Sequence, residues 1–317
     1  MKAAIVVAAG QPPVFGDFRD PTPAPGKSLI RVTASSLSHI TRNRASGKHY
    51  SADTALPFIP GIDGTGVTQD GQRVYFLLPE APFGAMAEFC LVDDRHRIAL
   101  PDSLDEDSAA AMAIPGMSSW AALVERANLR PGETVLINGA TGASGRLAIQ
   151  IAKHLGAGKI IATGRQTALF DDLKRLGADV TLPLVQDHDA LEHAFKHEFQ
   201  QGVDIVLDYL WGISAQTLVV AAAKAGPEGV PIRYVQIGSL SGANINLPGA
   251  ALRSSALQLM GSGIGSVPFG RLLAAIQGVL AAATAAGFGI AVQSMPLADV
   301  AKAWAAEDNG ARILLRP

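Results

Sequence analysis

The spacing of apolar and polar positions divides the chain into three stretches of different character. Over residues 1–100, short apolar runs are separated by Pro- and Gly-rich clusters, which is typical of a β-rich module. The strands predicted there are 3–7, 29–33, 64–68, 73–77, 85–92 and 97–100, with one short helix at 40–46. Two more helices are expected, one from Asp102 or Ser103 to residue 113 and one from Ser118 to residue 127.

Apolar runs and helical patterns alternate from residue 134 onward. Strands are predicted at 134–138, 160–163, 179–182, 203–207, 231–237 and 256–264, and helices at 143–155, 167–176, 189–199 and 214–225. Strands that alternate with helices predict an α/β fold with a doubly wound parallel sheet. The tail is mixed again, with helix 270–286, strand 290–294, helix 297–305 and strand 311–315, and we expect it to rejoin the first module.

The first strand–helix–strand unit, residues 134–165, has the pattern of a dinucleotide site. Its strand runs into the turn G-A-T-G-A-S-G at 139–145, in which an alanine stands where the first glycine of G-x-G-x-x-G would be. Backbone N–H groups at the start of the following helix bind a pyrophosphate in such units. We therefore expect phosphate contacts from Thr141, Gly142, Ala143, Ser144 and Gly145. Gly142 would let the backbone approach the phosphates, and Gly145 would allow close helix packing.

The end of the second strand in this unit distinguishes NAD from NADP. NAD sites place Asp or Glu there to bind the ribose hydroxyl, whereas NADP sites supply Arg. Here Gly164 and Arg165 form the tip, and no carboxylate follows before Asp171. A guanidinium binds a 2′-phosphate through paired hydrogen bonds, and an acid would repel it. The sequence predicts NADP(H) as the cofactor, with a solvated surface arginine as the alternative interpretation of Arg165.

Length, composition and charge restrict the class of protein. A chain of 317 residues exceeds a comfortable single core, and 48% hydrophobic with 17% charged residues is typical of a well-buried globular protein. The net charge of −2 and the scattered Lys and Arg residues predict no binding to nucleic acid or membrane surfaces. The N-terminal apolar run is too short for a signal peptide, and the apolar segment 272–292 contains Gln277 and Thr284. We expect a buried helix there and a cytoplasmic protein.

Several short motifs follow one another in a fixed order along nearly the whole chain. They are P-G-I-D-G-T-G at 60–66, G-M-S-S-W-A-A-L at 116–123, R-P-G-E-T-V-L-I-N-G-A at 130–140, the glycine turn with Q-I-A-K at 150–153, L-G-A-D at 176–179, G-V-D-I-V-L-D at 202–208, I-G at 237–238 and G-A-R-I-L-L at 310–315. Together they resemble the medium-chain dehydrogenase/reductase superfamily, specifically its zinc-free, quinone oxidoreductase-like branch. The resemblance implies a GroES-like catalytic domain (1–115 and 268–317) and a Rossmann NADP-binding domain (116–267). It also implies an interdomain cleft where nicotinamide meets substrate, and a homodimer formed through edge strands.

The positions of zinc ligands in related enzymes carry other residues here. Zinc-dependent relatives have Cys where Ser38 stands and His where Ile62 stands, and neither residue present offers a thiolate or an imidazole. Three further histidines, His188, His193 and His197, fall on one polar helical pattern and are interpreted as a solvated face. We therefore expect no metal.

The resemblance also assigns roles to individual positions. It places Ser118 beside the nicotinamide, Ile237 and Gly238 over its ribose, and Asp208 at the cofactor. Arg312 would approach the cofactor from the last strand, and Tyr50 would line the substrate pocket. The residues that the family would use for cofactor binding are thus Ser118, Thr141, Gly142, Ala143, Ser144, Gly145, Gly164, Arg165, Asp208, Ile237, Gly238 and Arg312.

The chain departs from the family pattern at several of these sites. Ser38 and Thr41 replace the usual Asn and Asp on the substrate side, and Leu169 replaces a frequent lysine for the 2′-phosphate. Arg165 is therefore left to bind that phosphate alone. Aromatic residues replace small ones at Tyr209 and Trp211, where they would either narrow the adenine side or pack into the core.

The missing zinc ligands limit the chemistry that is expected. Without a Lewis acid to polarise an alcohol or aldehyde, the reaction left is hydride transfer to an electrophilic acceptor, a quinone or an activated alkene. Tyr50 is the first candidate proton donor and Ser38 the second, with water as the alternative. We favour an NADPH-dependent quinone reductase. A reductase of α,β-unsaturated carbonyls (enone, enal or enoyl thioester) and a non-catalytic NADPH-binding protein remain open, because a Rossmann site indicates binding and not turnover.

Overall fold

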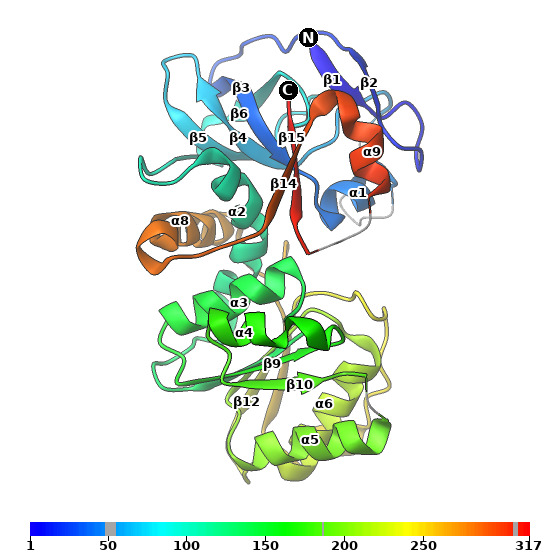
Figure 1. The fold of residues 1–317 in the computed structure, drawn as a ribbon, viewed down its shortest axis with the longest axis vertical. Helices are drawn as coiled ribbons and strands as arrows, with labels where there is room; N and C mark the ends of the chain where they lie inside the picture. Colours follow the sequence, from blue (N-terminus) through cyan, green and yellow to red (C-terminus); the bar gives the residue numbers. More distant parts are fainter. Residues whose placement is uncertain (48–54, 186, 307–309) are drawn as a thin grey trace. The chain divides into compact units, whose positions relative to one another are not determined.

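The computed structural model describes residues 1–47, 55–185, 187–306 and 310–317. The chain forms two compact units (Figure 1): unit 1 comprises Met1–Ile114 and Leu280–Pro317, and unit 2 comprises Pro115–Val279. The first boundary lies one residue before the predicted one. The second boundary lies between Val279 and Leu280, inside helix α8 (Phe269–Ala286). The sequence predicts it between residues 267 and 268, just before this helix. The first half of α8 stays with unit 2 because Val279 and Gly278 pack tightly against Gly116 and Trp120.

Unit 2 is built on a six-stranded parallel sheet with the order β10-β9-β8-β11-β12-β13. In chain order this reads 3-2-1-4-5-6, which is the strand order of the Rossmann fold. The strands are β8 (Thr134–Asn138), β9 (Lys159–Gly164), β10 (Val180–Pro183), β11 (Ile205–Asp208), β12 (Ile232–Gln236) and β13 (Leu257–Gly261). The doubly wound parallel sheet predicted from alternating apolar runs is confirmed.

The helices of unit 2 cover both faces of this sheet. They are α3 (Ala143–His154), α4 (Phe170–Leu176), α5 (His188–Gln200), α6 (Gly212–Ala225) and α7 (Gly249–Arg253). Figure 1 shows α3 and α4 on one side of the strands and α5 and α6 on the other. Phe195, Phe199 and Tyr234 are fully buried between the sheet and α5 and α6, and such aromatic burial stabilises the unit strongly.

Unit 1 contains a mixed sheet in the order β14-β15-β3-β4-β5-β7, with β6 paired to β3, and a separate β1-β2 pair. The elements are β1 (Lys2–Ile5), β2 (Val14–Asp17), β3 (Lys27–Ser36), α1 (His39–Ala45), β4 (Asp63–Thr68), β5 (Arg73–Leu77), β6 (Phe89–Asp93), β7 (Arg97–Ala99), β14 (Val292–Pro296), α9 (Val300–Ala305) and β15 (Arg312–Arg316). Strand β15 pairs with β3, Leu314 opposite Ser36. The tail therefore rejoins the N-terminal module through sheet hydrogen bonds, as expected.

Two helices predicted around Pro115 are in fact one. Helix α2 runs without interruption from Glu106 to Ala121 and continues as a π-helical turn over Ala122–Arg126. Proline inside a helix removes a hydrogen bond, and the helix survives here because its residues are deeply buried. Ser118 therefore does not begin a helix. Its Oγ donates to the carbonyl of Pro115 at 2.7 Å.

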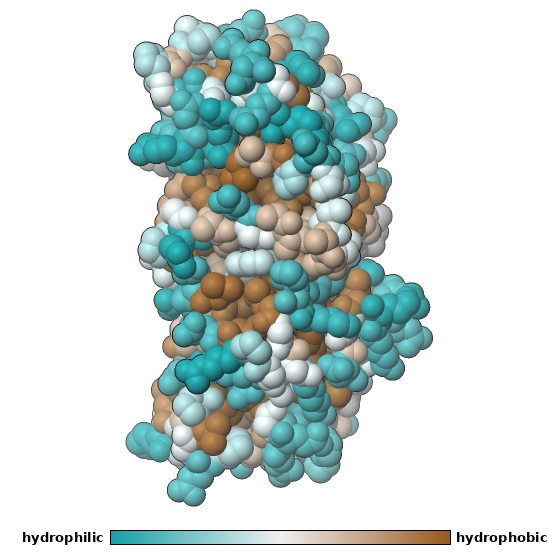
Figure 2. All heavy atoms as spheres, turned by 90° about the vertical axis from the view of Figure 1, so that its left-hand side faces the viewer, coloured by the Kyte–Doolittle hydropathy of each residue, from teal (hydrophilic) through white to brown (hydrophobic). Residues whose placement is uncertain are grey.

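Within the described residues, α8 is the one helix long and apolar enough to cross a membrane by length and composition. The core helix of a soluble protein passes the same test. One stripe of α8 is buried, including Leu272, Ile276 and Val279, so the helix is buried on one side as the spacing of apolar residues requires. Figure 2 shows apolar patches, broken up by polar side chains, on the side of the molecule that faces left in Figure 1. The expectation that the segment does not span a membrane remains a prediction.

Candidate functional site

The glycine turn lies between β8 and α3, where the sheet order changes direction between β8 and β11. Ligands of doubly wound sheets bind at this switch point, outside the carboxyl ends of the strands. Gly142 is the N-cap of α3 with φ −77° and ψ 167°, and no described side chain caps the helix. The first N–H groups of the helix, from Ala143 to Gly145, have no acceptor within the helix. They form the positive end of the helix dipole. This is the geometry of an anion site.

The glycines of the turn differ in what surrounds them. A Cβ atom at Gly142 would have no described atom within 4 Å, so this position is open to a ligand. A Cβ atom at Gly145 would lie 2.4 Å from the carbonyl oxygen of Gly139, and one at Gly164 would lie 2.4 Å from Cγ2 of Thr141. Gly145 and Gly164 thus bring helix, turn and second strand closer together than any side chain would permit.

Arg165 follows the last residue of β9 and is exposed. Among the described residues, no hydrogen bond or ion pair involves its guanidinium. The next acids along the chain are already paired, Asp171 with Lys174 and Asp172 with both Arg146 and Arg175. The tip of β9 therefore presents an arginine and no competing carboxylate, which suits a phosphate ligand.

Asp208 is fully buried at the end of β11 and binds the surrounding loops. One carboxylate oxygen accepts from Asn138 Nδ2 at 2.8 Å and from the N–H of Leu210 at 2.9 Å, and the other accepts from Tyr234 OH at 2.8 Å. Burial raises the pKa of Asp208, and these hydrogen bonds oppose the rise. The carboxylate holds the loop after β11 in place and does not face outward. The resemblance implies a direct contact between Asp208 and the cofactor. That contact stays a prediction, and this geometry does not favour it.

The glycine turn is tied to Asp208 by two residues that the sequence analysis missed. Thr163 Oγ1 donates to Asn138 Oδ1 at 2.8 Å and accepts from the N–H of Gly139 at 3.2 Å. Asn138 in turn donates to Asp208, as described above. Buried polar groups linked in this way fix a single local geometry. The signal available in the sequence was a polar residue at the end of each buried strand.

Ser118 and its neighbour Ser119 have different surroundings. Ser118 Oγ donates to the carbonyl oxygen of Pro115. Ser119 is buried, and its Oγ lies 2.8 Å from Tyr209 OH, 3.2 Å from the same Pro115 carbonyl oxygen and 3.5 Å from the carbonyl oxygen of Ser144. Burial raises the pKa of Tyr209 to about 12, so its phenol stays protonated and available for this hydrogen bond. Ser119, which the sequence analysis did not select, is therefore the serine that links α2 to the glycine turn.

The loop after β12 contains the predicted Ile237 and Gly238. Their N–H groups donate to the carbonyl oxygen of Asp208 at 2.8 and 3.1 Å. A Cβ atom at Gly238 would lie 2.6 Å from the carbonyl oxygen of Tyr209, so only glycine fits. Tyr209 is buried, and Trp211 packs edge-to-face on Tyr234, with ring centroids 6.4 Å apart. Core packing therefore accounts for both aromatic replacements.

The predicted residues of unit 1 lie around helix α1. Ser38 is its N-cap and accepts from the N–H of Thr41 at 3.1 Å, and the two buried hydroxyl oxygens lie 3.0 Å apart. A catalytic role for Ser38 stays a prediction, because these contacts are those of a helix cap. Tyr50, the first candidate proton donor, lies outside the described residues.

Arg312 is the first residue of β15, and its positive charge lowers the pKa of Asp63, which belongs to the same unit. Asp63 is completely buried, and its carboxylate accepts from Ser36 Oγ and Tyr75 OH, both at 3.1 Å. Burial raises its pKa to about 7, while these hydrogen bonds and the charge of Arg312 oppose the rise. The approach of Arg312 to the cofactor remains a prediction, and the structure assigns it a neighbour within its own unit.

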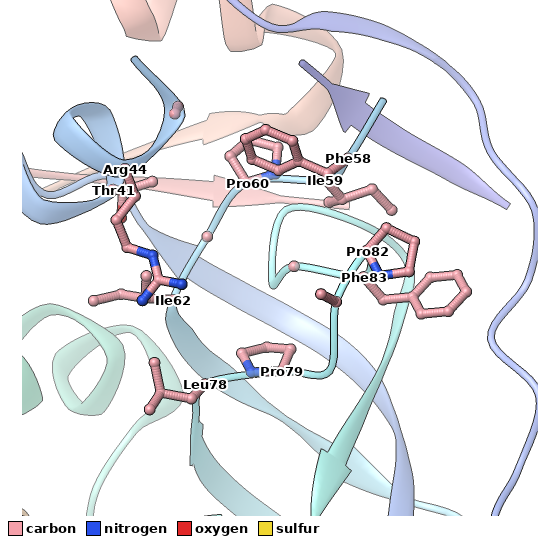
Figure 3. Close-up of a pocket in the computed structure, with 14 residues that line it drawn as sticks. Thr41, Arg44, Phe58, Ile59, Pro60, Ile62, Leu78, Pro79, Pro82 and Phe83 are labelled. Atoms are coloured by element: carbon pink, nitrogen blue, oxygen red, sulfur yellow. The ribbon is translucent and has the colours of Figure 1, made fainter. Parts of the chain in front are cut away.

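A hollow opens beside α1 in unit 1 (Figure 3). The hollow is open to solvent, and Figure 3 draws the residues that line it. Its walls come from α1 and from the loops 58–62 and 78–84. Apolar side chains such as Phe58, Ile62 and Leu78 dominate the lining, and Thr41 and Arg44 supply polar side chains. Two positions marked by the sequence analysis, Thr41 and Ile62, thus come together here.

Metal-ligating side chains do not gather in the described residues. No group of three or more His, Cys, Asp or Glu side chains able to hold an ion occurs among them. At the two positions that supply zinc ligands in relatives, Ser38 is a helix cap and Ile62 has no donor atom. The burial of Cys90 raises the pKa of its thiol far above the ordinary range.

The sequence and the fold both match known proteins. Residues 143–285 match a family model described as zinc-binding dehydrogenase. A probable NADPH-dependent quinone reductase of Emericella nidulans is 32% identical over 100% of both chains. A 2-methylene-furan-3-one reductase of Solanum lycopersicum is 31% identical over 50% of this chain and 45% of its own.

The fold likeness extends to a solved structure of the Thermus thermophilus quinone oxidoreductase, with a TM-score of 0.83 at 24% identity and complete coverage of both chains. At that identity the likeness shows the fold alone, a unit with a parallel Rossmann sheet and a unit with a mixed, GroES-like sheet. The relationship itself follows from the full-length sequence match. The chain belongs to the medium-chain dehydrogenase/reductase superfamily and is one of its quinone oxidoreductase-like members.

Proposed function

We propose that this protein is a zinc-independent, NADPH-dependent oxidoreductase that transfers a hydride to a quinone. Two features of unit 2 together carry the proposal. No described side chain caps the N-terminus of α3, and Arg165 stands at the end of the neighbouring strand β9. The first feature suits a pyrophosphate and the second a 2′-phosphate, which NADH lacks. The activity printed for the full-length Emericella nidulans relative supports the same conclusion.

The residues present fit the cofactor in both charge and space. Gly142 leaves room for a phosphate above the N–H groups of the helix, and the network from Asp208 through Asn138 holds the turn in shape. A bound NADPH would supply two electrons as a hydride, and a quinone that also took up one proton, from Tyr50, Ser38 or water, would become a hydroquinone while NADPH became NADP⁺. The protein's own contribution is to bind, orient and shield these groups. Proton donation by Tyr50 or Ser38 belongs to the proposal as well.

We propose that no zinc takes part, on the chemistry of the donor set. Ser38 offers a hydroxyl already used as a helix cap, and Ile62 offers no donor. The purified enzyme should therefore keep its turnover after dialysis against a strong chelator. Loss of activity on chelation, restored by zinc, would contradict this part.

Reduction of an α,β-unsaturated carbonyl is the second candidate, supported by the name of the Solanum lycopersicum relative. There the hydride adds to the β-carbon and a proton to the α-carbon, so the demands on the cofactor site are the same. The acceptor alone separates the two activities. A non-catalytic NADPH-binding protein is the third interpretation.

One panel assay separates all three. NADPH oxidation is followed with a set of quinones and a set of enones, and hydroquinone or saturated product is quantified against NADP⁺. The proposal predicts one product per NADP⁺ with quinones. Turnover with enones alone would establish the second candidate, and tight NADPH binding without any oxidation would establish the third.

We also propose a cytoplasmic homodimer. Strand β13 ends the sheet order of unit 2, and its outer edge pairs with no other strand in the described chain. Exposed strand edges invite pairing with another chain. The family expectation of edge-strand dimers supports a partner copy at an edge of this sheet, and of its two edge strands, β10 and β13, we choose β13 for the proposal.

A further inference from the structure

The ring of Tyr209 packs into the core of unit 2, but core packing does not explain its hydroxyl group. Tyr209 follows Asp208, the last residue of β11, and is buried. A phenylalanine would fill the same space without the cost of taking a hydroxyl out of water. Hydrogen bonds inside the protein offset that cost. The partners of the Tyr209 hydroxyl therefore indicate what it contributes.

The Tyr209 hydroxyl meets two consecutive serines of α2. It lies 2.8 Å from Ser119 Oγ. Burial raises the pKa of the phenol to about 12, and hydrogen bonds with Ser119 and Ser118 oppose the rise. Ser119 Oγ is also 3.2 Å from the carbonyl oxygen of Pro115 and 3.5 Å from that of Ser144 in the first turn of α3. A serine hydroxyl can donate to one such carbonyl while it accepts from the phenol, so two hydroxyl groups join the loop after β11 to α2.

The backbone of Tyr209 contacts two neighbouring segments of the sheet. Its carbonyl oxygen accepts from the N–H of Leu240 at 3.4 Å and would lie 2.6 Å from a Cβ atom at Gly238, both in the loop after β12. Its N–H donates to the carbonyl oxygen of Asn138, the last residue of β8, at 3.1 Å. One residue therefore links α2 to the ends of three adjacent strands, β8, β11 and β12.

The loop that begins at Tyr209 also holds a strained backbone. Trp211 has φ 57° and ψ −155°, a conformation that is almost restricted to glycine. Its N–H donates to both carboxylate oxygens of Asp208, at 3.1 and 3.3 Å, which helps to hold that conformation. Strain of this kind persists only where the surrounding structure imposes it, and it is concentrated at ligand sites. The loop 209–211 is therefore held in one shape next to the switch point of the sheet.

The place of this loop in the sheet indicates which part of a dinucleotide it would serve. A Rossmann sheet consists of two mononucleotide-binding halves, and the ligand lies across the carboxyl ends of the strands. The glycine turn and Arg165 belong to the first half and are proposed above for the pyrophosphate and the 2′-phosphate. The loops after β11 and β12 belong to the second half, which leaves them the nicotinamide and its ribose.

We propose that the Tyr209 hydroxyl is a positioning group for the nicotinamide half of the cofactor. Through Ser119 it fixes the loops after β11 and β12 relative to α2, so that these loops already have the conformation that binds this half. The proposal rests on the NADPH function above and deepens it, because it assigns the two halves of the cofactor to different residues. Tyr209 acts through its neighbours and is not a catalytic residue.

Two ligands that differ by the nicotinamide half test this assignment. NADPH carries both halves, whereas adenosine 2′,5′-bisphosphate carries the adenosine and the 2′-phosphate without the nicotinamide and its ribose. Their dissociation constants are measured by calorimetry in the unaltered protein, in Tyr209→Phe and in Ser119→Ala. Each variant removes one of the two oxygen atoms of the hydrogen bond and keeps the rest of the side chain.

The dissociation constant of NADPH should rise at least about threefold in both variants, while that of adenosine 2′,5′-bisphosphate should change less than about twofold. The double variant should lose no more affinity than the weaker-binding single variant, because both substitutions break the same hydrogen bond. Thr217→Val is the matched control. It removes a buried hydroxyl of the same unit that donates to the carbonyl oxygen of Ile213 within α6, and both dissociation constants should stay unchanged.

Arg165→Gln should give the opposite pattern, because both ligands carry the 2′-phosphate and both should bind more weakly. An equal loss for the two ligands in Tyr209→Phe and Ser119→Ala, or an unchanged NADPH affinity, would refute the role of Tyr209 and leave NADPH binding standing. If Tyr209→Phe did not fold, Ser119→Ala would decide, because it breaks the same hydrogen bond from the other side.

Failure of the proposed function has a different signature. Binding of NADH in place of NADPH by the unaltered protein would refute the NADPH function, and the same comparison between NADH and AMP would then decide the inference. Binding of no dinucleotide would overturn both.

Discussion

Gly142 and Gly145 stand three residues apart in the same turn, yet a methyl group would meet different surroundings at the two positions. Gly142→Ala fits the backbone angles and open space, so the unfolding free energy should change by about 1 kcal/mol or less. NADPH affinity should fall, because the methyl group enters the space proposed for the pyrophosphate. Gly145→Ala should instead destabilise the fold by more than about 2 kcal/mol, since its Cβ would overlap Gly139.

Thermal unfolding and calorimetric NADPH titration of the two variants measure these effects separately. Equal losses of stability at both positions, or unchanged NADPH affinity in Gly142→Ala, would contradict the assigned roles.

Asp63 predicts a pH dependence of stability. Its pKa is raised from 3.8 to about 7 in the folded protein, so between these values the folded state binds the extra proton. The contribution of Asp63 to stability is therefore complete below about pH 4 and is lost as pH rises toward 7, amounting to a few kcal/mol in order of magnitude. The unfolding free energy of the unaltered protein, minus that of Asp63→Asn, should fall over this range. Parallel curves for the two proteins would show that Asp63 does not titrate as the structure indicates.

At the scale of elements, regular periodicity predicted structure well and long-range packing overrode it in places. The six strands of unit 2 were predictable because each is a compact apolar run between glycines and helical patterns. The division of α2 at Pro115 was wrong because burial outweighs the local cost of proline. The strand Val14–Asp17 and the helix Gly249–Arg253 were missed because both are short and carry little apolar periodicity.

The candidate site was predictable only where its residues are neighbours in the chain. The glycine turn and Arg165 lie on one strand–helix–strand unit, so their arrangement follows from a local pattern. The hydrogen bond from Asn138 to Asp208 joins residues 70 positions apart and depends on β8 lying beside β11. Arg44 likewise meets loops from elsewhere in the chain, which no spacing rule reveals.

The free edge of β13 gives a prediction for assembly. A homodimer should sediment at twice the 32.9 kDa of one chain. Ile264→Asp, just after β13, should shift the population toward monomer, because a charge would be buried at the interface. Val185→Asp is the matched control: Val185 is also exposed but follows β10, at the opposite edge of the sheet. A monomer in the unaltered protein, or equal effects of both variants, would contradict an interface at β13.

At the scale of the whole molecule, the two compact units carry chemically different candidate sites. Unit 2 has an anion site at a helix terminus with an arginine nearby, and unit 1 has a mostly apolar hollow with a single guanidinium. Strand β15 returns the end of the chain to the sheet formed by its beginning, so unit 1 needs both termini to fold.

The central claim is that this chain uses NADPH because Arg165 binds the 2′-phosphate. The most direct test measures kcat/KM for NADPH and for NADH with one quinone, in the unaltered enzyme, in Arg165→Gln and in the control Arg175→Gln, whose arginine is paired with Asp172. The unaltered enzyme and the control should prefer NADPH clearly, and Arg165→Gln should lose at least about tenfold of that preference with NADH turnover unchanged. A preference for NADH in the unaltered enzyme, or full retention of the NADPH preference in Arg165→Gln, would contradict the account.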